Sequence, residues 1–405
     1  MFEDHGRSVE DASNNLSSAG HYRNADYVLQ HFDIDINDDV ITQVLVLFFK
    51  WQYSNFVFIY RDAFLQDHYG TRQDSKYWSL SLLLSRCHDA AESIAMVTDL
   101  VNPSITAVQT FLCLAFYDIG VGSLSKGWAF SGIAFRMAQD LGFQQDSELW
   151  PAHAKSFNSR EDHELRRRIY WGCYLSDKLI SLVFGRPVQL KYSESEVRPL
   201  ETLPDPPYIL PWRTVGFDDD AATNYTDISM IPYINEQIKL ARVLERMLGI
   251  MSSASNRIDI LPQRQNLDSL NYELMQWRKG LADWADFTVW DVMDKPLKPN
   301  IAALHLLYNS ARIALNFDEA TSSDTHESKI HAREACTLAA TEIHSIMRRF
   351  RNQHGLKHSP LIMVYAVVQA VRASKAFGTQ EEAKNLSDSM AELADTWPLA
   401  SSVTL

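Results

Sequence analysis

The stretch HELRRRIYWGCYLSDKLISLVFGRP, from His163 to Pro187, predicts one long helix with an abrupt end. Apolar side chains recur at helical spacing along one face, namely Leu165, Ile169, Cys173, Ile180 and Val183. Most of the other positions are apolar too, so we expect neighbouring helices to surround this one. Gly185 can take the left-handed conformation that closes a helix, and Pro187 cannot continue one.

Charged residues within this stretch need partners. Asp177 lies in an apolar segment, and a buried carboxylate requires a cation or several hydrogen-bond donors. We expect Arg186 to supply the cation, in a structural ion pair rather than as part of an acid catalyst, because no second catalytic group is indicated. The run Arg166–Arg168 opposes the helix dipole and therefore needs anionic partners. The flanking acids and the negative net charge favour ion pairing over contact with DNA phosphate. The acids near enough to pair are Glu161, Asp162 and Glu164.

A second segment, GWAFSGIAFRMAQDLGF from Gly127 to Phe143, precedes the long helix. Together with Glu164–Pro187 it resembles the regulatory (middle homology) domain of fungal binuclear zinc-cluster transcription factors, the fungal-specific transcription factor domain. The shared pattern is a small-residue helix ending in Leu-Gly, an arginine run with aromatic residues, and an aspartate followed by Gly-Arg-Pro. Lys178 stands where family members usually carry arginine. The pattern is carried by Trp128, Gly142, Arg166, Arg167, Trp171, Asp177, Gly185, Arg186 and Pro187.

Weaker similarity to the same family extends over about residues 40–375, in the segments Phe48–Leu65, Leu304–Leu315 and Ser359–Ala370. The resemblance implies a largely helical regulatory unit. The residues alone predict the same class, because apolar positions follow the helical period and no useful length alternates as a strand would. We therefore expect an all-α fold, a large bundle of antiparallel helical pairs.

The chain is predicted to hold one domain behind a short tail. Residues 1–20 are polar and are expected to be disordered, and residues 21–405 are expected to form a single helical regulatory domain. Prolines gather between Pro199 and Pro211, which predicts a long irregular connection over residues 186–232. Residues 233–405 then form the distal helices.

Composition narrows the class of protein. The net charge of −13 gives no basic surface for nucleic acid. The four cysteines lie far apart without a CxxC pair, so they predict reduced thiols rather than a zinc site. No secretory signal is visible, and the longest apolar run, Val44–Phe49, is too short to span a membrane.

Motifs that could carry chemistry are weak. The glycine-rich Gly120–Gly127 lacks the Gly-Lys-Ser/Thr order of a phosphate loop and is expected to be a turn between helices. His88 and Asp89, beside Cys87, would bind a metal only if further ligands converged there. His305 is expected to be a satisfied or exposed histidine in an amphipathic helix. We therefore predict no catalytic, cofactor-binding or metal-binding residue, and no enzyme.

Aromatic residues are concentrated between positions 277 and 290, at Trp277, Trp284, Phe287 and Trp290. They can form core or line a pocket. Core is favoured, although a helical fold of this size can hold a cleft of ligand size.

The resemblance implies a fungal transcription regulator of the nucleus, of which this chain is the regulatory or effector region. It would control transcription through contacts with the transcription machinery or co-regulators, as a homodimer, and could sense a small-molecule effector. The alternative is a structural homodimerisation platform of a DNA-associated complex, without a ligand. DNA and zinc would belong to an N-terminal zinc-cluster module that this sequence does not contain, so the chain is either part of a longer factor or a natural form lacking the cluster. No cofactor of its own and no membrane contact are expected.

Overall fold

Helices make up all of the regular structure that the computed structural model describes. It describes residues 38–52, 57–69, 76–83, 88–146, 160–198, 230–253, 260–288, 297–322, 327–378 and 380–403. Within these ranges there is no strand, which confirms the all-α class. The predicted tail at residues 1–20, Cys87, Trp290 and most of the predicted proline-rich connection lie outside the described residues, and the division into domains stays a prediction.

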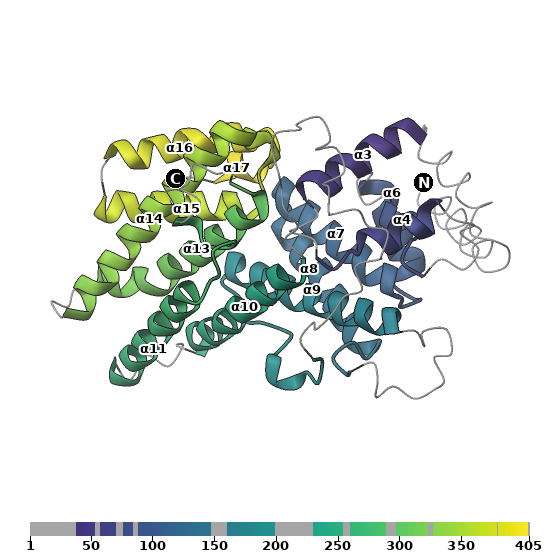
Figure 1. The fold of residues 1–405 in the computed structure, drawn as a ribbon, viewed down its shortest axis with the longest axis horizontal. Helices are drawn as coiled ribbons and strands as arrows, with labels where there is room; N and C mark the ends of the chain where they lie inside the picture. Colours follow the sequence, from purple (N-terminus) through teal and green to yellow (C-terminus); the bar gives the residue numbers. More distant parts are fainter. Residues whose placement is uncertain are drawn as a thin grey trace, which may run out of the picture.

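The N-terminal half, α3–α9, forms one end of the molecule in Figure 1. Its elements are α3 (Asp38–Trp51), α4 (Arg61–Tyr69), α5 (Leu80–Leu83), α6 (His88–Ile94), a π-helical turn η3 (Ala95–Asp99), α7 (Ile105–Val121), α8 (Leu124–Asp140) and α9 (Arg160–Phe184). A short 3₁₀ turn, η5 (Tyr192–Glu194), follows α9.

The C-terminal helices form the other end, and the two ends join in the middle of the view, where α9 and α10 lie (Figure 1). They are α10 (Met230–Ser253), α11 (Ile260–Lys279), α13 (Pro299–Thr321), α14 (Glu327–His354), the 3₁₀ turn η6 (Leu356–His358), α15 (Ile362–Phe377), α16 (Gln380–Ala394) and α17 (Leu399–Ser402). No described helix combines the length and the apolar character that crossing a bilayer requires.

Helices that are joined by short turns pack along each other. Extensive pairs are α7 with α8, α13 with α14, and α15 with both α14 and α16. The turn between α7 and α8 is only Gly122 and Ser123, so the predicted loop at Gly120–Gly127 is shorter than expected, and these two helices run antiparallel. The two halves meet where α9 packs on α10 and where α17 reaches α7.

The long helix predicted from residue 163 is α9, and it lies inside the molecule. Trp171, Cys173 and Tyr174 are fully buried, and the predicted apolar face is buried as well except for the half-buried Val183. Neighbours on several sides explain why this helix is apolar around most of its circumference. Trp277 and Phe287 are also buried, as core residues.

The ends of α8 and α9, which were predicted at Gly142 and Gly185, have the same geometry. Gly185 has φ +61°, Gly185 N–H donates to Leu182 O, and Arg186 N–H donates to Ser181 O. Gly142 has φ +70° and ends α8 with the equivalent pair of bonds. This is the Schellman arrangement, in which a left-handed residue lets the chain satisfy the last carbonyls of the helix as it turns away.

Gly172, in the middle of α9, is required by packing rather than by conformation. A Cβ atom added there would come within 2.6 Å of Phe58 Cα and 2.7 Å of Phe58 N. The backbone around Phe58 therefore approaches the helix more closely than any side chain would permit.

We expect Gly172→Ala to destabilise the protein by about 1–3 kcal/mol, because the clash is with backbone and forces the two segments apart. The control is Gly249→Ala, in the open face of α10, where no atom lies within 4 Å of the added Cβ. It should gain about 0.5–1 kcal/mol from helix propensity. Urea unfolding of both variants checks this, and equal effects would contradict the packing argument.

Candidate functional site

The carboxylate of Asp177 is the centre of a buried polar network. Asp177 is fully buried on α9 and accepts hydrogen bonds from Gln189 N–H at 3.0 Å and Leu190 N–H at 2.9 Å. Lys178 Nζ lies 2.9 Å from Asp177 Oδ2. The chain that leaves the Gly-Arg-Pro turn is thus held against α9 by the side chain of α9 itself.

The predicted pairing of Asp177 with Arg186 is wrong. The Arg186 guanidinium instead lies 4.7 Å from the centre of the Trp128 ring and 5.3 Å from that of Phe184. The turn at Gly185 explains the difference, because it folds the following backbone back onto Asp177 and leaves Arg186 beside the aromatic rings. Arg186 and Trp128 therefore form a cation–π contact between the end of α9 and α8.

Lys178 takes the place that was predicted for Arg186, and its side chain is as buried as that of Asp177. Its ammonium contacts Leu190 O, lies 3.6 Å from Glu245 Oε2, and stands 3.9 Å from the Tyr174 ring centre. Burial lowers the pKa of Lys178, and the charges of Asp177 and Glu245 oppose that shift. The signal for this role was present in the sequence, since Lys178 is the cation next to the buried acid.

Glu245 connects this network to α10. Its carboxylate accepts from Tyr174 Oη at 2.8 Å and from Tyr192 N–H at 3.0 Å. Burial, together with Glu245, raises the pKa of Tyr174, so the phenol remains protonated and donates. The network therefore joins α9, the segment after it, and α10 through fixed hydrogen bonds.

The side chains of Arg167 and Arg168 make their contacts inside the protein. Arg167 pairs with Glu164, as predicted, and with Asp146 at 2.9 Å, which the sequence did not indicate. Arg168 Nε donates to Val57 O at 3.1 Å, and its guanidinium lies over the Tyr60 ring.

Other motif residues in this region make contacts that range from buried to exposed. Arg166 is half-buried, and burial lowers its pKa while Tyr77 and Asp162 oppose the shift. Trp171 Nε1 donates to Arg198 O at 3.1 Å, and Pro187 O accepts from Ser181 Oγ at 3.3 Å. The motif residues that the structure brings together thus fix the ends of α8 and α9, and none of their contacts indicates bond-making chemistry.

A cavity of about 320 Å³ lies on another side of α9. Leu179 and Val183 of α9 form one wall, and Tyr365, Val368 and Gln369 of α15 form the opposite wall. The sequence did not reveal it, because its walls are about 180 residues apart along the chain. Its volume falls in the lower part of the range found for small-molecule sites.

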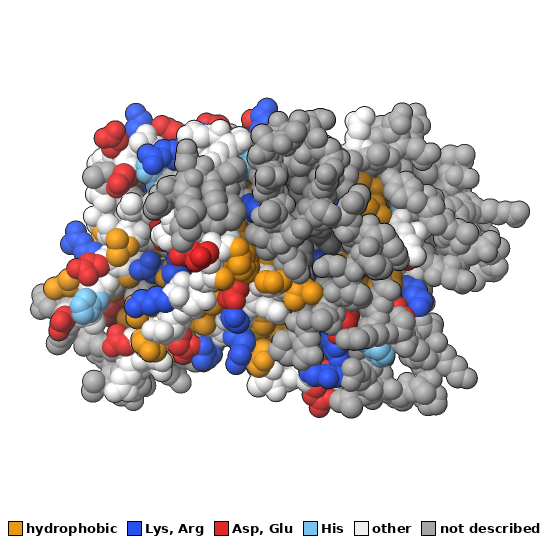
Figure 2. Space-filling model, in the orientation of Figure 1, with side chains coloured by type: hydrophobic (Ala, Val, Ile, Leu, Met, Phe, Trp, Pro, Cys, Tyr) orange, Lys and Arg blue, Asp and Glu red, His pale blue; other side chains and the backbone are white. Residues whose placement is uncertain are grey.

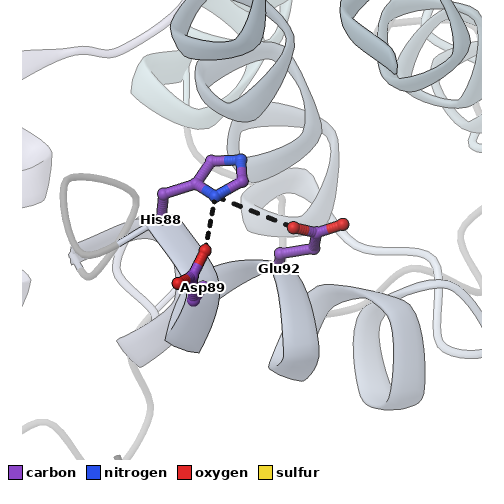
Figure 3. A group of neighbouring side chains, drawn as sticks. All are labelled: His88, Asp89 and Glu92. Carbon is purple, nitrogen blue, oxygen red and sulfur yellow. Dashed lines mark hydrogen bonds and ion pairs between the residues drawn. The ribbon is translucent and has the colours of Figure 1, made fainter. Parts of the chain in front are cut away.

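His88 stands in a cluster of acidic groups, shown in Figure 3. Its Nδ1 faces Asp89 Oδ1 at 3.0 Å and Glu92 Oε2 at 3.7 Å, and its Nε2 lies 3.2 Å from Asp118 Oδ1. Lys126 Nζ lies 2.5 Å from Glu92 Oε2 and already supplies a positive charge. Lys126 Nζ also lies 3.8 Å from Asp118 Oδ1, so its ammonium supplies positive charge to the carboxylates of both Glu92 and Asp118.

His305, on α13, is a buried histidine held by the backbone. Its Nε2 donates to Ala285 O at 2.7 Å, whereas its buried Nδ1 has no hydrogen-bond partner, so the predicted satisfied histidine holds for one ring nitrogen only. Burial lowers the pKa of His305 to about 3, and the charge of Arg278 adds to the effect. The neutral ring is therefore a structural part of the contact between α13 and the segment after α11.

Comparison with known proteins connects this geometry to a family. Residues 91–279, from α6 to the end of α11, match the family model described as "Fungal specific transcription factor domain". The match includes the whole of α9 and its network. No solved structure gives a significant match.

Sequence similarity to individual proteins extends beyond that segment. The "Uncharacterized transcriptional regulatory protein C757.04" of Schizosaccharomyces pombe is 31% identical over 89% of this chain and 61% of its own length. The "Activatory protein CHA4" of Saccharomyces cerevisiae is 26% identical over 83% of this chain and 55% of its own length. The "Nitrogen assimilation transcription factor nirA" of Emericella nidulans is 25% identical over 82% of this chain and 40% of its own length.

The chain spans less than two thirds of the length of each of these relatives. The family and the relatives are named as transcription regulators and not as enzymes, in agreement with the prediction that this chain is not an enzyme.

We expect Lys178→Met to destabilise the protein by about 3–5 kcal/mol, because it leaves the buried Asp177 carboxylate without its cation. The control is Lys191→Met, which removes an exposed lysine paired with Glu194 and should change stability little. Urea unfolding measures both. A loss for Lys178→Met no greater than that for the control would show that the ion pair does not hold the network.

The shifted pKa of His305 predicts a pH dependence of stability. Below about pH 6.5 the unfolded chain takes up a proton at this position, whereas the folded chain does so only near pH 3. Stability is therefore lost as the pH falls, by about 2 kcal/mol between pH 7 and pH 5. In His305→Gln, this loss of unfolding free energy between pH 7 and pH 5 should vanish. In the exposed control His331→Gln it should remain. Unfolding free energies at the two pH values check this, and equal slopes in the three proteins would contradict it.

Proposed function

We propose that this chain is the regulatory region of a fungal transcription regulator that acts in the nucleus through contacts with other proteins. The observation that carries the proposal is the family match over residues 91–279, which coincides with the buried α9 network. The printed names of the three relatives support the same role. The homodimer and the small-molecule effector expected from the sequence belong to this proposal.

Direct contact of this chain with DNA is disfavoured by its charges. The net charge is −13, and Arg167 and Arg168 of the family motif are buried in internal contacts. On the face shown in Figure 2, lysines and arginines are interspersed with acidic residues over the described part, without a continuous basic stripe. DNA contact and zinc are therefore assigned, within this proposal, to a zinc-cluster module outside these residues.

A reporter assay tests the role. The 405-residue chain, fused to an unrelated DNA-binding domain, should change expression of a reporter that carries the matching DNA site, relative to that domain alone. The effect should weaken in the Lys178→Met fusion, whose fold is compromised, and persist in the Lys191→Met fusion. A folded and abundant wild-type fusion that leaves the reporter at the level of the DNA-binding domain alone would contradict the proposal.

A further inference from the structure

The cavity beside α9 lies where the two halves of the molecule meet. Phe116 and Ile119 of α7 and Val183 of α9 belong to the N-terminal half, whereas Val368 of α15 and Leu399 of α17 belong to the C-terminal half. A molecule that fills the cavity therefore contacts both halves at once. Its binding would strengthen their packing, because a ligand that binds only the assembled arrangement stabilises that arrangement.

One end of the cavity is polar. Gln369 is 8% exposed, and its Oε1 is buried without a hydrogen-bond partner. Tyr365 lies one helical turn earlier, and burial raises its pKa to about 12. The Tyr365 hydroxyl therefore keeps its proton and can donate it. Both residues line the cavity, so an amide and a phenol lie one helical turn apart in its wall.

The remaining surface of the cavity sets the size and charge of a ligand. None of the side chains that line it is charged, so an ionised ligand would lose its hydration without gaining a partner. Its volume of about 320 Å³ is roughly twice that of an engineered cavity of about 150 Å³ that binds benzene. A neutral molecule of about a dozen non-hydrogen atoms would fill it. An adjoining cavity of about 60 Å³ has room for little more than water.

We propose that this cavity is a binding site for a neutral, mainly apolar small molecule whose single polar group donates to Gln369 Oε1 and accepts from the Tyr365 hydroxyl. The proposal rests on the proposed regulatory function in one respect, since such a ligand is an effector only if the chain regulates transcription. An alcohol, a phenol or a primary amide on an apolar body has the required chemistry. The ligand would act by fixing how α15 and α17 pack against α7 and α9.

Three naphthalene probes test the chemistry on the purified 405-residue chain. The neutral alcohol 2-naphthol should bind saturably, and it should bind about five- to tenfold more tightly than naphthalene, which lacks the hydrogen-bonding group. The anion 2-naphthoate should bind at least tenfold more weakly than 2-naphthol, because no cation receives it. Equilibrium dialysis measures all three. Absence of saturable binding of 2-naphthol to the folded chain would overturn the proposal.

Two variants locate the site. Gln369→Leu should remove the advantage of 2-naphthol over naphthalene, while Gln380→Leu, at an exposed position of α16, should keep it. Val183→Trp should fill the cavity and abolish binding of both probes. If Val183→Trp does not fold, the Gln369→Leu ratio decides alone. An unchanged ratio in Gln369→Leu, or unchanged binding in a folded Val183→Trp, would overturn the assignment.

The reporter assay separates the site from the function. A wild-type fusion whose reporter output changes with 2-naphthol, while that of the Gln369→Leu fusion changes less, supports an effector site. An active fusion that does not respond to a bound probe overturns the effector role and leaves the regulatory function intact. An inactive fusion with a functional binding site instead contradicts the proposed function.

Discussion

The buried charge of Asp177 constrains everything around the centre of this protein. A carboxylate without solvent has to be matched at every oxygen, and here two backbone N–H groups after the helix and the ammonium of Lys178 match it. That requirement fixes the direction of the chain after Gly185. It also fixes α10, because Glu245 of that helix completes the environment of the same ammonium. The packing of α9 follows from these polar contacts as much as from its apolar surface.

The same helix therefore has two surfaces with different properties. Asp177 and Lys178 form the hydrogen-bonded network, whereas Leu179 and Val183 line the cavity. On the side of the cavity, the two halves meet mainly through apolar side chains of α9, α15 and α17.

The sequence predicted what depends on local chemistry. Helical periodicity identified α9 and its buried face, and Gly142 and Gly185 marked the ends of their helices because each supplies the left-handed residue. The backbone donors to Asp177 could not be predicted, since the turn at Gly185 brings them back to the helix and they carry no side-chain signal. The cation, Lys178, was its neighbour in the sequence. Asp146 and the cavity were missed for a related reason. Both depend on which distant segments pack together, and periodicity within one segment does not specify that.

The buried motif residues and the side chains that line the cavity differ in how freely they can vary between related proteins. Asp177 and Trp171 are buried, and their contacts hold the fold together. A change at either position would disturb the common framework before it altered any partner or ligand. The walls of the cavity carry no such network, except at Tyr365 and Gln369, so their side chains can vary in size and polarity at lower cost. Within this architecture, α9 maintains the framework with one surface and, with the other, lines the space where a ligand would be selected.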